Sequence, residues 1–154
     1  MQAMIITAFG KVIRVEVEQG LHFQMPCQTE RKTLSLAINT MQVRGSSVPD
    51  STGSPMDVSS IINYVITDPI AAEYNVENLH SFIHNQAQDI VRRVCSKFRY
   101  RATQQKPDEP SLIDDGHHVA KHMAQLMNHR CKVAGVEIMR MVFIDIAYVP
   151  EIAA

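Results

Sequence analysis

The sequence predicts an α+β fold in which a twisted, mainly antiparallel sheet packs against two long amphipathic helices. The first half of the chain holds short runs of β-branched residues separated by turn residues, which is typical of antiparallel strands. The second half holds two segments with apolar residues at three- and four-residue spacing, which indicates helices with one buried face. A last β-rich run, residues 136–146, follows the second of these segments.

The composition fits one soluble globular domain spanning residues 1–154. Hydrophobic residues make up 45% of the chain and charged residues 20%, so a sizeable core can form. The net charge of −1 offers no basic field, and we expect no nucleic-acid partner. Three scattered cysteines without a C-x-x-C motif indicate a reducing, cytoplasmic compartment. No stretch is long and apolar enough to span a bilayer, and no signal peptide is present.

The first half of the chain is expected to form strands. Residues 4–9 and 12–17 are predicted as a hairpin with its turn at Gly10 and Lys11. Residues 21–29 are predicted to be an irregular crossing segment, because Pro26 cannot lie in a central strand.

Two further strands are expected after this crossing. Alternating apolar residues predict a strand at residues 33–38 and another at residues 56–67. The Ser-, Gly- and Pro-rich residues 45–55 between them are predicted to be a hairpin loop with its turn at residues 50–53.

Three helices are expected next. Asp68 followed by proline predicts an N-cap and first turn, with the helix ending near Tyr74. Asn75 is predicted to cap a second helix over residues 76–98. The third is predicted to begin at Leu112 or Asp114 and to end at residue 132.

The C-terminal helix is expected to turn directly into a strand. Gly135 can adopt the left-handed conformation that ends a helix. The strand at residues 136–146 carries apolar residues on both faces, so we expect it to be an inner strand.

Two histidine pairs are candidate metal ligands. His80 and His84 lie four residues apart on the second predicted helix, and His118 and His122 do so on the third. Such a spacing can present two imidazoles to one metal ion. Neither pair has the glutamate of an H-E-x-x-H site, and the alternative is that all four lie on solvated helix faces.

A basic cluster lies at the C-terminal end of the second predicted helix. It is formed by Arg92, Arg93, Lys97, Arg99 and Arg101. It is a candidate contact for anionic lipid or an acidic partner. The alternative is a solvated helix end that complements the helix dipole. If it binds lipid, replacing Arg92, Arg93 and Lys97 by Gln should weaken binding to anionic liposomes.

Motifs of known catalytic chemistry are missing from the sequence. There is no G-x-S-x-G elbow, no G-x-x-x-x-G-K-[ST] phosphate loop and no G-x-G-x-x-G turn. A Ser, Cys or Asp nucleophile could still meet a histidine in space, but nothing in the sequence nominates one. A histidine- or metal-dependent enzyme built on His80, His84, His118 and His122 is the alternative function.

Several motifs together resemble the SPFH domain, also called the band-seven or PHB domain, of stomatins, prohibitins and flotillins. They are FGK at residues 9–11, QGLHF at 19–23, the strand followed by DP at 63–69, and AGVEI with IDIAYVPEIA within residues 134–153. The family's proline before GLH is Gln19 here.

The resemblance implies a non-enzymatic scaffold, without cofactor or small-molecule substrate, that forms homo-oligomers at membranes, organises membrane microdomains and regulates membrane-protein partners. It also implies a membrane segment before the first hairpin and a coiled coil after the PEIA corner, and this chain carries neither. The expected localisation is therefore membrane-associated, with the chain alone soluble.

Overall fold

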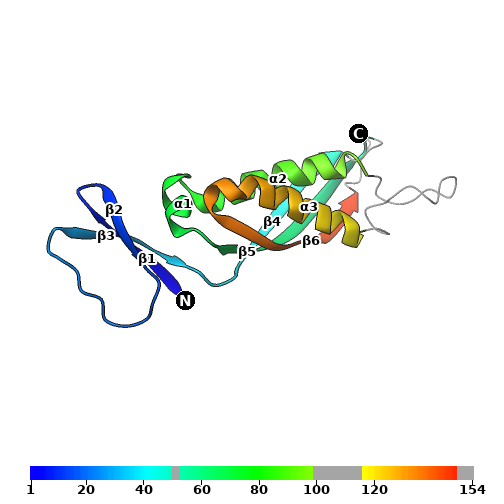
Figure 1. Cartoon of the computed structure of the whole chain (residues 1–154). Helices are drawn as coiled ribbons and strands as arrows, with labels where there is room; N and C mark the ends of the chain where they lie inside the picture. The colour runs from blue at the N-terminus through cyan, green and yellow to red at the C-terminus, as the bar shows by residue number, and fades with distance from the viewer. Residues whose placement is uncertain (50–52, 99–115, 149–154) are drawn as a thin grey trace.

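The computed structural model describes residues 1–49, 53–98 and 116–148, and it confirms the α+β class (Figure 1). The strands form two three-stranded antiparallel sheets instead of the one sheet predicted. The N-terminal sheet has the order β2-β1-β3, from Gln2–Ala8 (β1), Lys11–Glu16 (β2) and Gln28–Ser35 (β3). The central sheet has the order β4-β5-β6, from Asn39–Pro49 (β4), Pro55–Ile66 (β5) and Val136–Tyr148 (β6).

The helices are α1 (Pro69–Tyr74), α2 (Leu79–Cys95) and α3 (Gly116–Cys131), followed by a 3-10 turn at Lys132–Ala134. In α1 the Asp68 carboxylate accepts hydrogen bonds from the amides of Ile70 and Ala71, so the predicted cap is confirmed. The predicted start of the second helix at residue 76 is wrong, because Asn78 is the residue whose side chain caps α2.

The two helices are shorter than predicted in the described part of the chain. α2 has 17 residues and α3 has 16, so the prediction of two long helices is not confirmed. The predicted start of the third helix at Leu112 or Asp114 lies outside the described residues. Gly135 has φ 63 and ends the helical segment, as predicted.

Two strand predictions are wrong. The segment at residues 45–49 belongs to β4, because it pairs with β5 despite its low β propensity. β3 begins at Gln28, five positions before the predicted start at Thr33, since it pairs along β1 from Ala8 back to Gln2.

The C-terminal strand β6 is an edge strand, which corrects the prediction of an inner strand. It pairs with β5, and β5 is the central strand of its sheet. The register shifts beside Asn63 and Ser59 leave Met139 and Ile144 as bulged residues of β6. Both side chains are exposed, so apolar residues on both faces of this strand reflect bulges and not a second covering layer.

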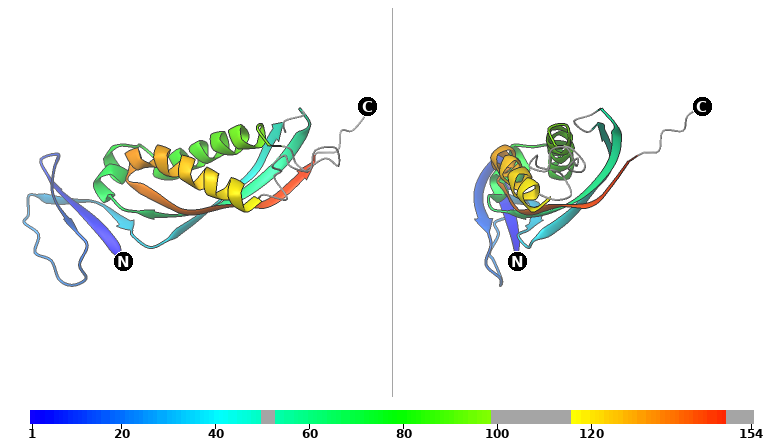
Figure 2. Two further views of the ribbon diagram at one scale, coloured as in Figure 1. Left: turned by 45° about the vertical axis from the view of Figure 1, so that its right-hand side comes forward. Right: turned by 90° about the vertical axis from the view of Figure 1, so that its right-hand side faces the viewer.

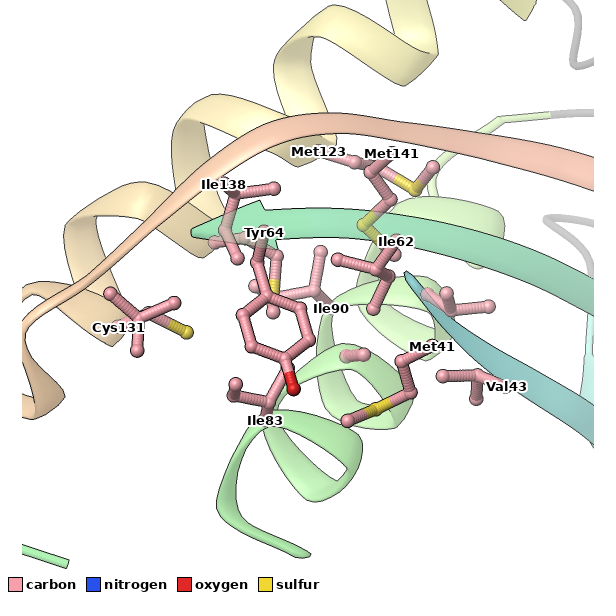
Figure 3. Close-up of a cluster of buried hydrophobic side chains, with 14 of the residues drawn as sticks. Met41, Val43, Ile62, Tyr64, Ile83, Ile90, Met123, Cys131, Ile138 and Met141 are labelled. Atoms are coloured by element: carbon pink, nitrogen blue, oxygen red, sulfur yellow. The ribbon is translucent and has the colours of Figure 1, made fainter. Parts of the chain in front are cut away.

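The core lies between the central sheet and the two helices that cover one of its faces (Figures 1 and 2). β4 and β5 contribute Met41, Val43, Ile62 and Tyr64, and these meet side chains of α2, α3 and β6 (Figure 3). Burial raises the pKa of Tyr64.

The helices α2 and α3 run antiparallel over this face (Figures 1 and 2). Arg130 near the end of α3 bonds to Gln86 and Asp89 in the middle of α2, with an Arg130 Nη1 to Asp89 Oδ2 distance of 2.5 Å. The N-terminal sheet extends beyond the helices at one end of the molecule, and the last turn of α2 lies at the other end (Figures 1 and 2).

Candidate functional site

The β1–β2 turn holds an exposed aromatic residue in a strained conformation. Ala8 and Lys11 are paired, so Phe9 and Gly10 form a two-residue hairpin turn. Both have positive φ, 50° for Phe9 and 79° for Gly10, as a type I′ turn requires. Such a turn favours Asn-Gly, and a non-glycine residue held there costs about 1–3 kcal/mol. The Phe9 side chain is 93% exposed, so the fold presents this ring to the surroundings at a cost in stability.

The loop between β2 and β3, residues 17–27, exposes further apolar side chains. Leu21, Phe23 and Met25 are all exposed, and Leu21 makes no burying contact. Their backbone is nevertheless anchored, because the Arg14 guanidinium donates a hydrogen bond to the Phe23 carbonyl. His22 Nδ1 also lies 3.1 Å from Glu16 Oε2 on β2.

A second set of hydrogen bonds ties the end of this loop to β3. The Met25 amide donates to Gln28 Oε1 at 3.2 Å, and the Gln28 amide donates to the Met25 carbonyl at 3.0 Å. The loop is therefore a fixed structure whose apolar side chains point away from the core.

The turn and the C-terminal part of the loop meet at the Ala8 end of β1. Ala8 pairs with Lys11 on one side and with Gln28 on the other, so the Phe9 turn and the Met25 turn are neighbours. Both lie at the end of the elongated molecule that the helices do not cover (Figures 1 and 2).

We call this surface the apolar end and define it by Phe9, Ile13, Leu21, Phe23 and Met25. Ile13 is included because it is a bulged residue of β2: Val12 and Arg14 pair with β1, whereas Ile13 between them has no partner there. Its side chain is 50% exposed. Exposed Lys11 lies next to the Phe9 turn. An aromatic residue beside a lysine is a combination enriched where proteins meet a membrane interface.

A depression of about 450 Å³ lies beside the loop, between it and the N-terminus. Its lining mixes apolar side chains such as Met4 and Val17 with Glu16, Glu18 and His22. Within the described parts of the chain, no three His, Cys, Asp or Glu side chains converge as metal ligands, here or elsewhere.

The predicted histidine pairs do not come together. His80 and His84 lie in the first half of α2, whereas His118 and His122 lie in the first half of α3. Because the helices are antiparallel, the two pairs lie toward opposite ends of the helix layer (Figure 1). The arrangement gives no support to the metal- or histidine-dependent enzyme.

The basic cluster is described only in part, since Arg99 and Arg101 lie outside the described residues. Arg92, Arg93 and Lys97 are exposed at the end of α2. Arg93 pairs with Asp89 one turn earlier, at 3.1 Å. The end of α2 that carries Arg92 and Arg93 lies at the opposite end of the molecule from the apolar end (Figures 1 and 2).

The buried cysteines have the properties of core residues and not of nucleophiles. Burial raises the pKa of Cys95 to about 12 and that of Cys131 to about 11, so both thiols stay protonated at neutral pH. Cys27 is exposed in the loop between β2 and β3.

Reasoning from the sequence missed the apolar end, although a signal was present. The hairpin prediction used Gly10 and Lys11 as the turn, whereas Phe9 and Gly10 occupy its central positions. The signal is an aromatic residue where Asn is favoured, followed by the alternating apolar residues Leu21, Phe23 and Met25 in a segment that Pro26 makes unsuitable for a central strand.

Two further findings concern membrane-spanning helices and the family to which the chain belongs. Within the described ranges, no helix combines the length and the apolar character that crossing a membrane requires. No curated protein matches the chain. The family model described as SPFH domain / Band 7 family matches residues 1–154, which is the whole chain. The protein is therefore a member of the SPFH domain / Band 7 family.

Proposed function

We propose that this chain is a non-enzymatic scaffold domain that docks on a membrane surface through its apolar end and assembles there with further copies. The SPFH domain / Band 7 family is in general a family of membrane-associated, non-enzymatic scaffolds. The observation that carries the proposal is the exposed Phe9 ring in a left-handed turn beside Leu21, Phe23 and Met25.

The energetics of the apolar end favour weak, reversible docking. Fully burying one side chain such as Phe or Leu is worth about 1.5–3 kcal/mol, and entry into the interface is only partial. A lysine near an anionic surface adds about 1 kcal/mol, which Lys11 can supply. One copy therefore holds a membrane loosely.

Assembly would convert this loose docking into stable association. Linking binding modules can raise the overall affinity by about 10²–10⁴ without any new contact. A scaffold whose copies each present an apolar end would thus stay on the membrane only when assembled. The assembly that we propose is a homo-oligomer that organises the membrane beneath it and the membrane proteins beside it.

Liposome flotation tests the docking surface. We expect a triple variant, Phe9→Asn with Leu21→Ser and Phe23→Ser, to float much less than the wild type on liposomes that contain anionic lipid. Phe9→Asn suits the turn, so loss of folding does not explain the loss of binding.

A matched control is Val133→Ser, which removes a 62% exposed apolar side chain outside the apolar end. It should float like the wild type. Equal flotation of the triple variant and the wild type would refute docking through the apolar end.

A further inference from the structure

Polar side chains at the base of the loop between β2 and β3 form one connected network. The network centres on the Glu16 carboxylate, whose two oxygens have different partners. Oε1 lies 2.7 Å from Nε of Arg14, and Oε2 lies 3.1 Å from Nδ1 of His22. Arg14 in turn donates a hydrogen bond to the Phe23 carbonyl. Glu16 therefore ties the loop to β2 through two separate side chains.

The second ring nitrogen of His22 is also engaged. Its Nε2 lies 2.8 Å from the Glu18 carbonyl oxygen, so the ring bridges the Glu18 backbone and the Glu16 carboxylate. A carbonyl oxygen and an ionised carboxylate are both acceptors only. A neutral imidazole has one donor and one lone pair, so either tautomer sets a lone pair against an acceptor. Only the doubly protonated ring donates to both groups at once.

The charged groups around this ring come from β2, the loop and the start of the chain. β2 supplies Arg14 and Glu16, the loop supplies the exposed Glu18, and the α-amino group of Met1 lies at the same depression. Among the described residues, the depression is otherwise lined by side chains that do not titrate, namely Gln2, Met4, Val17, Gln19 and Thr33. Arg14, Glu16 and Glu18 together carry one net negative charge, which a protonated His22 cancels.

The ring lies within the part of the loop that presents apolar side chains. His22 stands between Leu21 and Phe23 in the chain, and both of these residues belong to the apolar end. Its contacts with Glu16 and Glu18 fold this segment back onto the end of β2. The state of the ring therefore decides how firmly the Leu21 and Phe23 side chains are held.

The other end of the loop does not depend on the ring. The Met25 amide bonds to the Gln28 side chain and the Gln28 amide bonds to the Met25 carbonyl, and none of these groups titrates. A change in the charge of His22 thus acts on one half of the loop and leaves the other half in place.

We propose that His22 is a positioning residue that makes docking of the apolar end sensitive to pH. The protonated ring holds the segment of Leu21 and Phe23 against β2. As the pH rises through the range in which histidine titrates, from about 5 to about 8, the ring loses one of its two bonds and the segment loosens. A loosened segment loses more conformational entropy on docking, so it binds a membrane more weakly.

The change in charge acts in the same direction as the change in order. A protonated His22 adds a positive charge beside the docking surface, and positive charge near an anionic surface strengthens binding. Docking should therefore be stronger in mild acid than at neutral pH. This regulation rests on the proposed function, because it acts on the same docking surface.

Fluorescence anisotropy tests the positioning without a membrane. The chain has no tryptophan, so Phe23→Trp provides a single reporter at an exposed position. We expect its anisotropy to fall as the pH rises from about 5.5 to about 7.5, and to be independent of pH once His22→Gln is added. Phe9→Trp is the matched control, because pairing of β1 with β2 holds its turn, and its anisotropy should not follow pH. A Phe23→Trp signal that ignores pH, or that follows pH equally with His22→Gln, would overturn the proposal.

Flotation at the same two pH values tests the consequence for docking. The wild type should float several-fold more on anionic liposomes at about pH 5.5 than at about pH 7.5, and His22→Gln should lose most of this difference. His80→Gln removes an exposed histidine from α2 and should keep the wild-type difference. If His22→Gln and His80→Gln respond to pH alike, the effect comes from overall charge and His22 has no special role.

Glu16→Gln tests the partner of the ring. The amide that replaces the carboxylate cannot pair with a positive charge, so the Phe23→Trp reporter should have low anisotropy at both pH values. Wild-type pH dependence in this variant would show that the contact between Glu16 and His22 does not position the loop.

The two proposals fail separately. Flotation that the triple variant of the apolar end abolishes, but that does not change with pH, refutes the role of His22 and leaves docking intact. Anisotropy of Phe23→Trp that follows pH through His22, combined with flotation unaffected by the triple variant, refutes the docking site and leaves the positioning of the loop intact.

Discussion

At the scale of residues, the same left-handed backbone serves two purposes. At Gly135 packing also requires glycine, since a Cβ atom there would lie 2.5 Å from the Asp68 carbonyl oxygen. The Gly135 carbonyl also accepts from the amides of Thr67 and Asp68, joining β5 to the start of β6. At Phe9 nothing in the turn demands an aromatic side chain. Gly135 could be predicted because glycine at a helix end has a backbone reason, whereas the rules of hairpin turns favour Asn and not Phe at position 9.

Replacing Gly135 by Ala should lower the free energy of unfolding by about 2–3 kcal/mol, because the new Cβ meets backbone that cannot move aside. Urea unfolding followed by circular dichroism measures the change. Gly53→Ala is the matched control, since Gly53 has φ +86 but open space around its Cβ position. A loss at Gly135 no larger than the loss at Gly53 would show that the close approach to Asp68 is unimportant.

At the scale of elements, the sequence was informative where local chemistry decides the structure. The Asp68 cap and α1 follow from side-chain hydrogen bonds made within a few residues. β4 was missed, because the strand character of residues 39–49 comes from pairing with β5. The edge position of β6 was missed because bulges and a second layer both place apolar residues on the two faces of a strand.

The pairing of α2 with α3 should depend on pH through Asp89. Its hydrogen bond with Arg130 first, and the charges of Arg93 and Arg130 next, hold the pKa of this carboxylate below its ordinary value of 3.8. A carboxylate with a lowered folded-state pKa contributes stability above its unfolded pKa and loses it as the pH falls through the folded pKa.

Asp89→Asn should therefore lower Tm at neutral pH, and the difference from the wild type should shrink as the pH falls below 3.8. Thermal unfolding of both proteins across this range is the measurement. A difference that stays constant down to low pH would assign the effect to packing and not to charge.

At the scale of the whole molecule, the apolar end and the end of α2 with Arg92 and Arg93 lie at opposite ends (Figures 1 and 2). From Leu79 to Arg92, α2 alone contributes about 20 Å of helix to this separation. A molecule that docks by its apolar end holds Arg92, Arg93 and Lys97 away from the bilayer. We therefore propose that this cluster contacts an acidic protein partner, and not lipid.

If the cluster contacts lipid, as one reading of the sequence has it, replacing Arg92, Arg93 and Lys97 by Gln should weaken binding to anionic liposomes. The position of these residues in the structure predicts instead that the binding is unchanged. Flotation of the triple Gln variant on anionic and on neutral liposomes separates the two expectations. Weaker flotation on anionic liposomes alone would show that the cluster reaches the membrane and that the molecule lies along its surface.

The anchored loop between β2 and β3 has a kinetic consequence. Because the hydrogen bonds from Arg14 and Gln28 hold its backbone, Leu21, Phe23 and Met25 are already exposed before any membrane is met. Association then requires no slow rearrangement, and little conformational entropy is lost on docking. Capture should be rapid at any stage of assembly, and the residence time should be set by how many copies are joined.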